Sequence, residues 1–138
     1  MIAYLDSSVL VANVLLESGL TGLKSAWERA DNVVSSLLIR PEASAAVQRA
    51  TRAGRVTAPD VVLVRVELTA WLDSITSVAV DADIANLAAD LAERESLRGC
   101  DAVHLATALR LRDPDVVFLT LDRDLAEAAR RNGLAVAA

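Results

Sequence analysis

Short apolar runs alternate with helix-forming segments along this 138-residue chain, and this alternation constrains its fold more than any other feature. Most runs are followed by residues that favour the start of a helix. The runs predicted to be strands are Ile2–Leu5, Val33–Leu37, Val78–Val80, Val116–Thr120 and Leu134–Ala137. Strands that alternate with helices favour an α/β fold, with a central, mostly parallel sheet of about five strands and helices on both faces.

The segment between Val56 and Ile75 allows two interpretations. The sequence from Ala58 to Asp60 has a proline suited to a helix start, and a helix could continue through Trp71-Leu72. The run Val61–Val64 has strand propensity instead. Both alternatives stay open at this stage.

The length fits a single domain over residues 1–138, since no Pro-, Gly- or Ser-rich linker divides the chain. No apolar run approaches the ~20 residues of a membrane span, and no secretory signal follows Met1. We therefore expect a soluble, cytoplasmic protein with no membrane partner. The single cysteine, Cys100, lacks companion ligands for zinc and is expected to be buried beside Gly99.

Four carboxylates stand where predicted strands end or predicted helices begin, and two of them directly follow a strand. Asp6 follows the first strand and, with Ser7 and Ser8, would cap a helix over Val9–Glu17. Asp122 follows the fourth strand. In parallel sheets the active site forms outside the carboxyl ends of the strands, so both acids are expected there.

The other two carboxylates fall in first turns of predicted helices. Pro41 fits the first helical position, which needs no N–H, and so places Glu42 in a first turn. Gly99 would end one helix, and Asp101 would begin the next. Each acid could instead be a structural cap worth ~0.3–1 kcal/mol, as Asp81 is expected to be.

Gathering four carboxylates requires a compensating charge. Two negative charges ~4 Å apart repel by ~4 kcal/mol at an effective dielectric constant near 20. Protons could neutralise them through raised pKa values, but Mg²⁺ and Mn²⁺ prefer oxygen ligands and join carboxylates to phosphate and water. The pattern favours metal-dependent hydrolysis of a phosphate substrate, which needs no side-chain nucleophile.

Three segments resemble motifs of the PIN-domain nucleases, in the same order and with the same spacing along the chain. They read LDSSVLV from Leu5, CDAVHLATA from Cys100 and LTLDRDL from Leu119. In length and architecture the chain resembles the VapC toxins of bacterial toxin–antitoxin pairs. The resemblance implies a PIN-like three-layer fold and a Mg²⁺- or Mn²⁺-dependent endoribonuclease, which cleaves RNA phosphodiester bonds with a metal-activated water.

The resemblance also implies roles for the acids. Asp6 and Asp101 would be the principal metal ligands. Glu42 would complete the acidic centre and orient the attacking water. Asp122 would contribute directly or through water, although the motif does not exclude Asp124 as the ligand in its place.

The implied partners are an RNA substrate, a cognate VapB-like antitoxin that lies along a groove near the site, and a second copy in a homodimer. The core is the default place for Trp27 and Trp71, but a chain with 54% hydrophobic residues can leave some helix surface for a partner. A PIN-domain RNA-processing nuclease that is not a toxin is the alternative.

Several polar side chains near the acids are candidates for supporting roles. Ser7, Ser8 and Thr120 could hydrogen-bond an acid, although a hydroxyl beside a helix start is more often a cap. His104 lies three residues after Asp101, on the same helix face. Between apolar neighbours, we expect His104 to be a hydrogen-bonded structural residue rather than a general base.

The net charge of −5 is unusual for a protein that binds RNA. Metal would cancel part of it, and Arg40, Arg98 and Arg123, each close in sequence to an acid, are candidates for holding the RNA backbone. Solvated or salt-bridged arginines are the equal alternative. With 3% aromatic residues there is no base-stacking platform, so recognition should depend on RNA shape and backbone.

Two other function classes fit less well. A haloacid-dehalogenase-type phosphatase needs a second aspartate two residues after the first and a downstream lysine, but Ser8 holds that position and Lys24 is the only lysine. A receiver domain also needs a late lysine. A degenerate binding module would have lost an acid, and all four are present.

Overall fold

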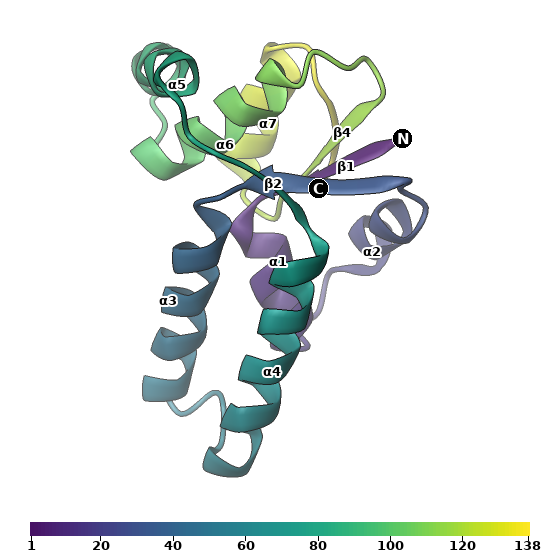
Figure 1. Cartoon of the computed structure of the whole chain (residues 1–138), viewed down its shortest axis with the longest axis vertical. Coiled ribbons are helices and arrows are strands. Elements are labelled where there is room, and N and C mark those ends of the chain that lie inside the picture. The colour runs from purple at the N-terminus through teal and green to yellow at the C-terminus, as the bar shows by residue number, and fades with distance from the viewer.

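The computed structural model describes residues 1–138 and contains one sheet of five parallel strands, in the order β3-β2-β1-β4-β5 (Figure 1). The strands are β1 (Ile2–Leu5), β2 (Asn32–Ser36), β3 (Thr76–Val78), β4 (Val116–Leu119) and β5 (Ala135–Ala137). The helices are α1 (Ser7–Val14), α2 (Thr21–Glu28), α3 (Ile39–Arg52), α4 (Ala58–Ser74), α5 (Ala82–Glu95), α6 (Gly99–Arg110) and α7 (Arg123–Arg131). The predicted α/β class is confirmed.

β1 is the central strand, and its side chains enter hydrophobic cores on both faces of the sheet. Ala3 and Leu5 contribute to one core and Tyr4 to the other. This burial explains the continuous apolar run in the sequence, because side chains alternate between the faces of a strand. From β1 the chain crosses to β2 on one side, and it returns much later as β4 on the other. The carboxyl ends of β1 and β4 therefore flank a topological switch point, where α/β proteins form their sites.

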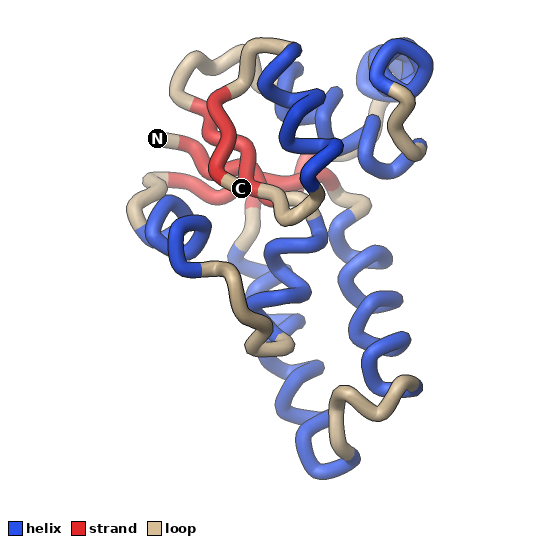
Figure 2. Tube along the Cα trace, turned by 180° about the vertical axis from the view of Figure 1, so that it is seen from behind, coloured by secondary structure: helices blue, strands red, loops and turns tan.

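Two layers of helices cover the sheet (Figures 1 and 2). α1, α2, α3 and α4 share a core with Ala3 and Leu5, whereas α5, α6 and α7 pack with Tyr4 and Phe118 on the opposite face. α3 and α4 run side by side and project away from the sheet. The three-layer arrangement expected from the sequence is present.

The ambiguous segment after Val56 is the helix α4. Leu68 and Leu72, four residues apart, are buried against the core, so packing of one helical face outweighs the strand propensity at its start. Sequence inspection did not predict α2, whose Trp27 packs edge-to-face on Trp71 of α4 with ring centroids 4.7 Å apart.

One predicted strand was displaced. β3 covers Thr76–Val78, two residues before the predicted Val78–Val80. This strand lies at the edge of the sheet, where Thr76 and its neighbour can pair with β2 although they are polar. Val80 is exposed, and Asp81 after it caps α5 through the N–H of Ile84 at 2.8 Å.

Two helix boundaries also differ from prediction. α1 ends at Val14 rather than Glu17, because Leu16 adopts a left-handed backbone conformation with φ of 55°. α3 begins at Ile39, so Pro41 is the third helical residue and not the first. Proline is tolerated throughout a first turn, since those N–H groups lack helical partners.

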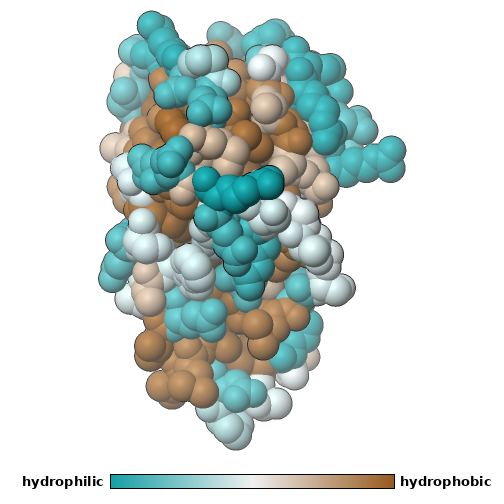
Figure 3. Space-filling view, turned by 90° about the vertical axis from the view of Figure 1, so that its right-hand side faces the viewer, coloured by the Kyte–Doolittle hydropathy of each residue, from teal (hydrophilic) through white to brown (hydrophobic).

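The projecting end of the molecule carries exposed apolar side chains. Val62, Leu63 and Val66 of α4 are among the exposed large hydrophobic residues, and Figure 3 shows apolar surface gathered at the α3–α4 end. None of the helices is both long and apolar enough to span a membrane.

Candidate active site

The four carboxylates identified in the sequence lie at one edge of the sheet, carried by four different elements. Asp6 and Asp122 cap α1 and α7, while Glu42 and Asp101 lie in the first turns of α3 and α6. Because the strands are parallel, their carboxyl ends lie along the same edge of the sheet, and the four helices begin at or beside this edge.

Asp6 is the most buried of the four acids, with 4% of its surface exposed. Its Oδ1 accepts hydrogen bonds from the N–H of Ser8 at 3.0 Å and the Ser8 hydroxyl at 2.5 Å. Its Oδ2 accepts one from the Thr120 hydroxyl at 2.6 Å. Burial raises the pKa of Asp6, and the hydrogen bonds from Ser8 and Thr120 oppose this rise.

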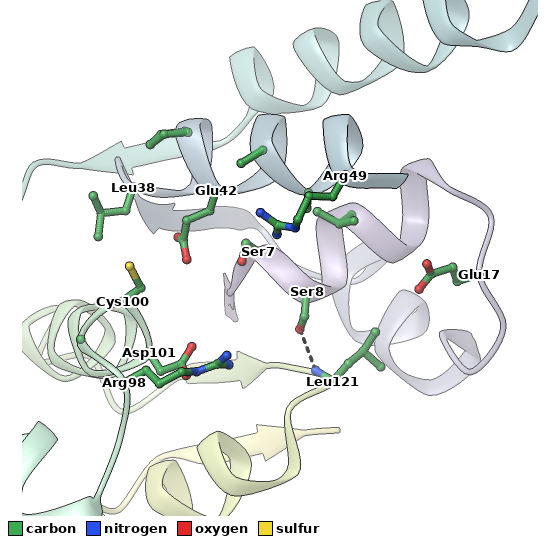
Figure 4. Close-up of a pocket in the computed structure, with 15 residues that line it drawn as sticks. Ser7, Ser8, Glu17, Leu38, Glu42, Arg49, Arg98, Cys100, Asp101 and Leu121 are labelled. Atoms are coloured by element: carbon green, nitrogen blue, oxygen red, sulfur yellow. Dashed lines mark hydrogen bonds and ion pairs between the residues drawn. The ribbon is translucent and has the colours of Figure 1, made fainter. Parts of the chain in front are cut away.

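The same two hydroxyls join β1 to the chain that leaves β4. The Ser8 oxygen also accepts the N–H of Leu121 at 3.0 Å (Figure 4), and the Thr120 oxygen accepts the N–H of Asp122 at 3.0 Å. Ser8 and Thr120 therefore fix Asp6 and the loop that carries Asp122. Ser7 faces the adjacent groove and makes no hydrogen bond to an acid.

Arg98 links the second pair of acids. Its Nε lies 3.0 Å from Asp101 Oδ2, and its Nη2 lies 3.5 Å from Asp122 Oδ2. Asp122 also caps α7, where its Oδ1 accepts the N–H of Leu125 at 3.0 Å. The Arg98 side chain is 81% exposed, so it can leave these carboxylates without disturbing the core. Asp124 is exposed, and its side chain forms no hydrogen bond or ion pair.

Glu42 has a different partner. Its Oε1 lies 2.6 Å from Nε2 of His104, a histidine on α6 that is 1% exposed. His104 is thus buried and hydrogen-bonded, as expected, and one of its partners is a candidate catalytic acid.

A groove of about 960 Å³ runs between α3 and α6. Figure 4 shows Glu42 on one wall, with Cys100 and Asp101 on the other. The expectation that Cys100 is buried was wrong: Gly99 begins α6, so the cysteine lies in an exposed first turn at the mouth of the groove.

The structure separates the three candidate arginines. Arg98 lines the groove, but Arg40 bonds to the carbonyl of Leu72 and to Asp73 at 3.3 Å, which ties it to α4. Arg123 is exposed and pairs with Glu127 of its own helix. Neither Arg40 nor Arg123 lines the groove.

Arg49 lines the groove and was missed in the sequence. It lies on α3 seven residues after Glu42, which is two helical turns, and its side chain points along the same wall (Figure 4). This spacing was the available signal, but Arg49 is distant in sequence from every motif.

The chemistry of the four acids suits a hard divalent cation, which prefers oxygen ligands, because they are carboxylates on four elements at the same end of the sheet. No three acidic, histidine or cysteine side chains are grouped closely enough to hold a metal as they stand. Arg98 and His104 occupy oxygens of Asp101, Asp122 and Glu42. Metal binding at Asp101 would therefore compete with Arg98.

Comparison with known proteins identifies the family. The model of the PIN domain matches residues 3–131. Two Mycobacterium tuberculosis proteins, ribonuclease VapC45 and ribonuclease VapC49, are each 32% identical over 99% of this chain and 94% of their own length.

Solved structures share the fold. PAE2754 from Pyrobaculum aerophilum matches with a TM-score of 0.68 and 21% identity over 99% of this chain and 92% of that one. FitAcB from Neisseria gonorrhoeae matches with a TM-score of 0.66 and 18% identity over 99% of this chain and 96% of that one. A toxin–antitoxin complex from Klebsiella pneumoniae matches with a TM-score of 0.63 and 22% identity over 90% of both chains. On the full-length similarity and the family match, the chain belongs to the PIN-domain family and is a homologue of the VapC ribonucleases.

Proposed function

We propose that this protein is a Mg²⁺-dependent endoribonuclease that acts as the toxin of a toxin–antitoxin pair. The observation that carries this proposal is the position of four carboxylates at the carboxyl ends of the strands, with Glu42 and Asp101 lining the groove, in a chain similar over its full length to proteins named as ribonucleases. PIN-domain nucleases are in general metal-dependent, which agrees with an oxygen-rich site.

Asp6 and Asp101 are the residues we assign to hold the metal, with Asp122 as a direct or water-linked contributor. Asp122 is favoured over Asp124 because Asp122 shares Arg98 with Asp101, whereas Asp124 is exposed and forms no ion pair. A divalent cation bound by these residues, Mg²⁺ or Mn²⁺, would supply water activation and charge stabilisation at the phosphate.

The side chains of the groove have separate tasks. Glu42 faces the groove and is placed to hold a proton of the attacking water. Arg98 and Arg49 are placed to bind RNA phosphates, a role suited to the guanidinium fork. No aromatic side chain lines the groove, so base stacking does not guide binding there and contacts to the RNA backbone must.

The decisive test compares the parent protein with its Asp6→Asn variant on structured RNAs, in Mg²⁺ and in chelator. We expect cleavage only by the parent and only with metal. Asp124→Asn is the matched control and should cleave normally. Equal cleavage by Asp6→Asn, or cleavage that survives chelation, would contradict the proposal.

The proposed antitoxin is a VapB-like protein, supported by the likeness of the fold to a toxin–antitoxin complex. Its association, or that of a second copy of this chain, would cover exposed apolar side chains such as Val62 and Val66. Expression of the parent should arrest growth where Asp6→Asn does not. Normal growth with an active enzyme would favour an RNA-processing nuclease instead.

A further inference from the structure

Both ring nitrogens of His104 are hydrogen-bonded inside the protein. Nδ1 lies 3.0 Å from the hydroxyl of Tyr4, and Nε2 lies 2.6 Å from Oε1 of Glu42. The contacts connect β1, α6 and α3, so they cross from one helical layer to the other at the edge of the sheet that carries the acids.

The tautomer of His104 follows from the groups at its two ends. The Tyr4 oxygen accepts the backbone N–H of Ser36 at 3.0 Å, which leaves the hydroxyl proton free to point to His104 Nδ1. Tyr4 is fully buried, and a phenol, with an ordinary pKa of about 10, keeps its proton at neutral pH. Nδ1 is then an acceptor.

The other nitrogen must therefore carry the ring proton. With the proton on Nε2, the ring donates to the Glu42 carboxylate. The opposite tautomer would set two acceptors, Nε2 and Oε1, against each other at 2.6 Å. The Glu42 carboxylate has no other partner in the protein, so this single bond determines where it points.

We infer that His104 is a positioning residue: held by Tyr4 as the neutral Nε2–H tautomer, it orients the Glu42 carboxylate toward the groove. This inference rests on the role proposed for Glu42. A chain of hydrogen bonds ends on Glu42: the Ser36 N–H donates to Tyr4, the Tyr4 hydroxyl to His104, and the His104 ring to Glu42. Tyr4 and His104 are buried, which fixes their orientations. Neither Tyr4 nor His104 touches the substrate.

The tautomer can be tested without any substitution, because His104 is the only histidine in the chain. Long-range proton–nitrogen NMR of protein labelled with ¹⁵N-histidine reports a single imidazole. We expect a protonated Nε2, an unprotonated Nδ1 and a slowly exchanging Nε2 proton, with that proton shifted in Glu42→Gln. A proton on Nδ1, a mixture of tautomers or a doubly protonated ring would overturn the inference.

Kinetics then separate positioning from a structural role. His104→Leu should lower kcat about tenfold and leave KM unchanged, since it removes one hydrogen bond to a charged group. His104→Gln retains an N–H donor at this position and should recover most of the loss. In a Glu42→Gln background, His104→Leu should cause no further loss of kcat.

Equal losses in the Leu and Gln variants, or additive losses with Glu42→Gln, would contradict positioning. Thermal unfolding of each variant shows whether a loss of kcat comes from loss of the folded state. The NMR experiment on the unaltered protein tests the two His104 hydrogen bonds independently of the variants. Failure of the parent to cleave RNA would overturn the proposed function, and the nitrogen signals would still test the His104 bonds separately.

Discussion

Asp6 is the residue whose burial costs the folded protein most among the candidate ligands. Burial raises its pKa above the ordinary value of 3.8, which means that ionisation is harder in the folded state than in the unfolded state. The free energy of unfolding should therefore fall as pH rises from about 3.8 through the raised pKa, and stay lowered above it.

Replacing Asp6 with Asn should remove this cost. The amide can keep the bond from the N–H of Ser8, and the Thr120 hydroxyl can turn to accept from it. At pH 7 in chelator we expect Asp6→Asn to have a higher Tm than the parent, with the difference shrinking toward pH 3. Metal should raise the Tm of the parent alone. Circular dichroism melts across this pH range provide the measurement, and a parent as stable as Asp6→Asn at pH 7 would refute the prediction.

Arg98 neutralises Asp101 and Asp122 in the absence of metal, so metal and arginine compete for the same oxygens. Arg98→Ala should bind Mn²⁺ more tightly than the parent because no cation has to be displaced. The same variant should cleave RNA more slowly, since it loses a phosphate contact. Calorimetric titration with Mn²⁺ measures the first effect. Arg123→Ala is the control, because Arg123 lies outside the groove, and it should change neither the Mn²⁺ affinity nor the rate of RNA cleavage.

At the scale of elements, the turn between α5 and α6 sets the position of Arg98. α5 ends at Glu95, and the next residue, Ser96, caps it in a left-handed conformation with φ of 54° and ψ of 42°. Serine has a Cβ that disfavours this region, whereas glycine does not. Ser96 is exposed, so its substitution should act through the backbone alone.

Ser96→Gly should raise the free energy of unfolding by up to about 1 kcal/mol, after the entropy that glycine adds to the unfolded chain is subtracted. Ser96→Val should lower it, because β-branched residues tolerate this conformation least. Urea unfolding of both variants gives the comparison. A stabilised valine variant would contradict the assignment of strain to this position.

The elements also show how far local sequence determines the fold. The apolar run of β1 and the acid at its end, Asp6, could be predicted because burial on both faces and helix capping leave local signatures in the sequence. β3 was displaced because its pairing with β2, a long-range contact, places the polar residues Thr76 and Ser77 in a strand that an apolar run does not mark. Cys100 was misplaced because its exposure depends on the groove, which two distant helices form. The contact of His104 with Glu42 joins residues 62 positions apart, so spacing could not reveal it.

On the scale of the whole molecule, the charge distribution matters more than the net charge of −5. Most acids at the groove are paired with Arg98 or His104, and bound metal would offset the negative charge further. RNA affinity should therefore come from a few arginines at the groove, while the net negative charge of the protein repels the RNA phosphates. Such binding is weak and sensitive to salt.

Arg49 gives the clearest test of this view, because it faces the groove and has no ion-pair partner in the structure. In the Asp6→Asn background, which prevents cleavage, Arg49→Ala should weaken binding of a labelled RNA hairpin and reduce the slope of log K against log salt concentration. One lost phosphate contact corresponds to a reduction of about 0.7 to 0.9. Fluorescence anisotropy over a salt series measures it, with Arg123→Ala as the control. An unchanged slope in Arg49→Ala would place the RNA backbone elsewhere, since a phosphate bound along α3 must release its counterion to this arginine.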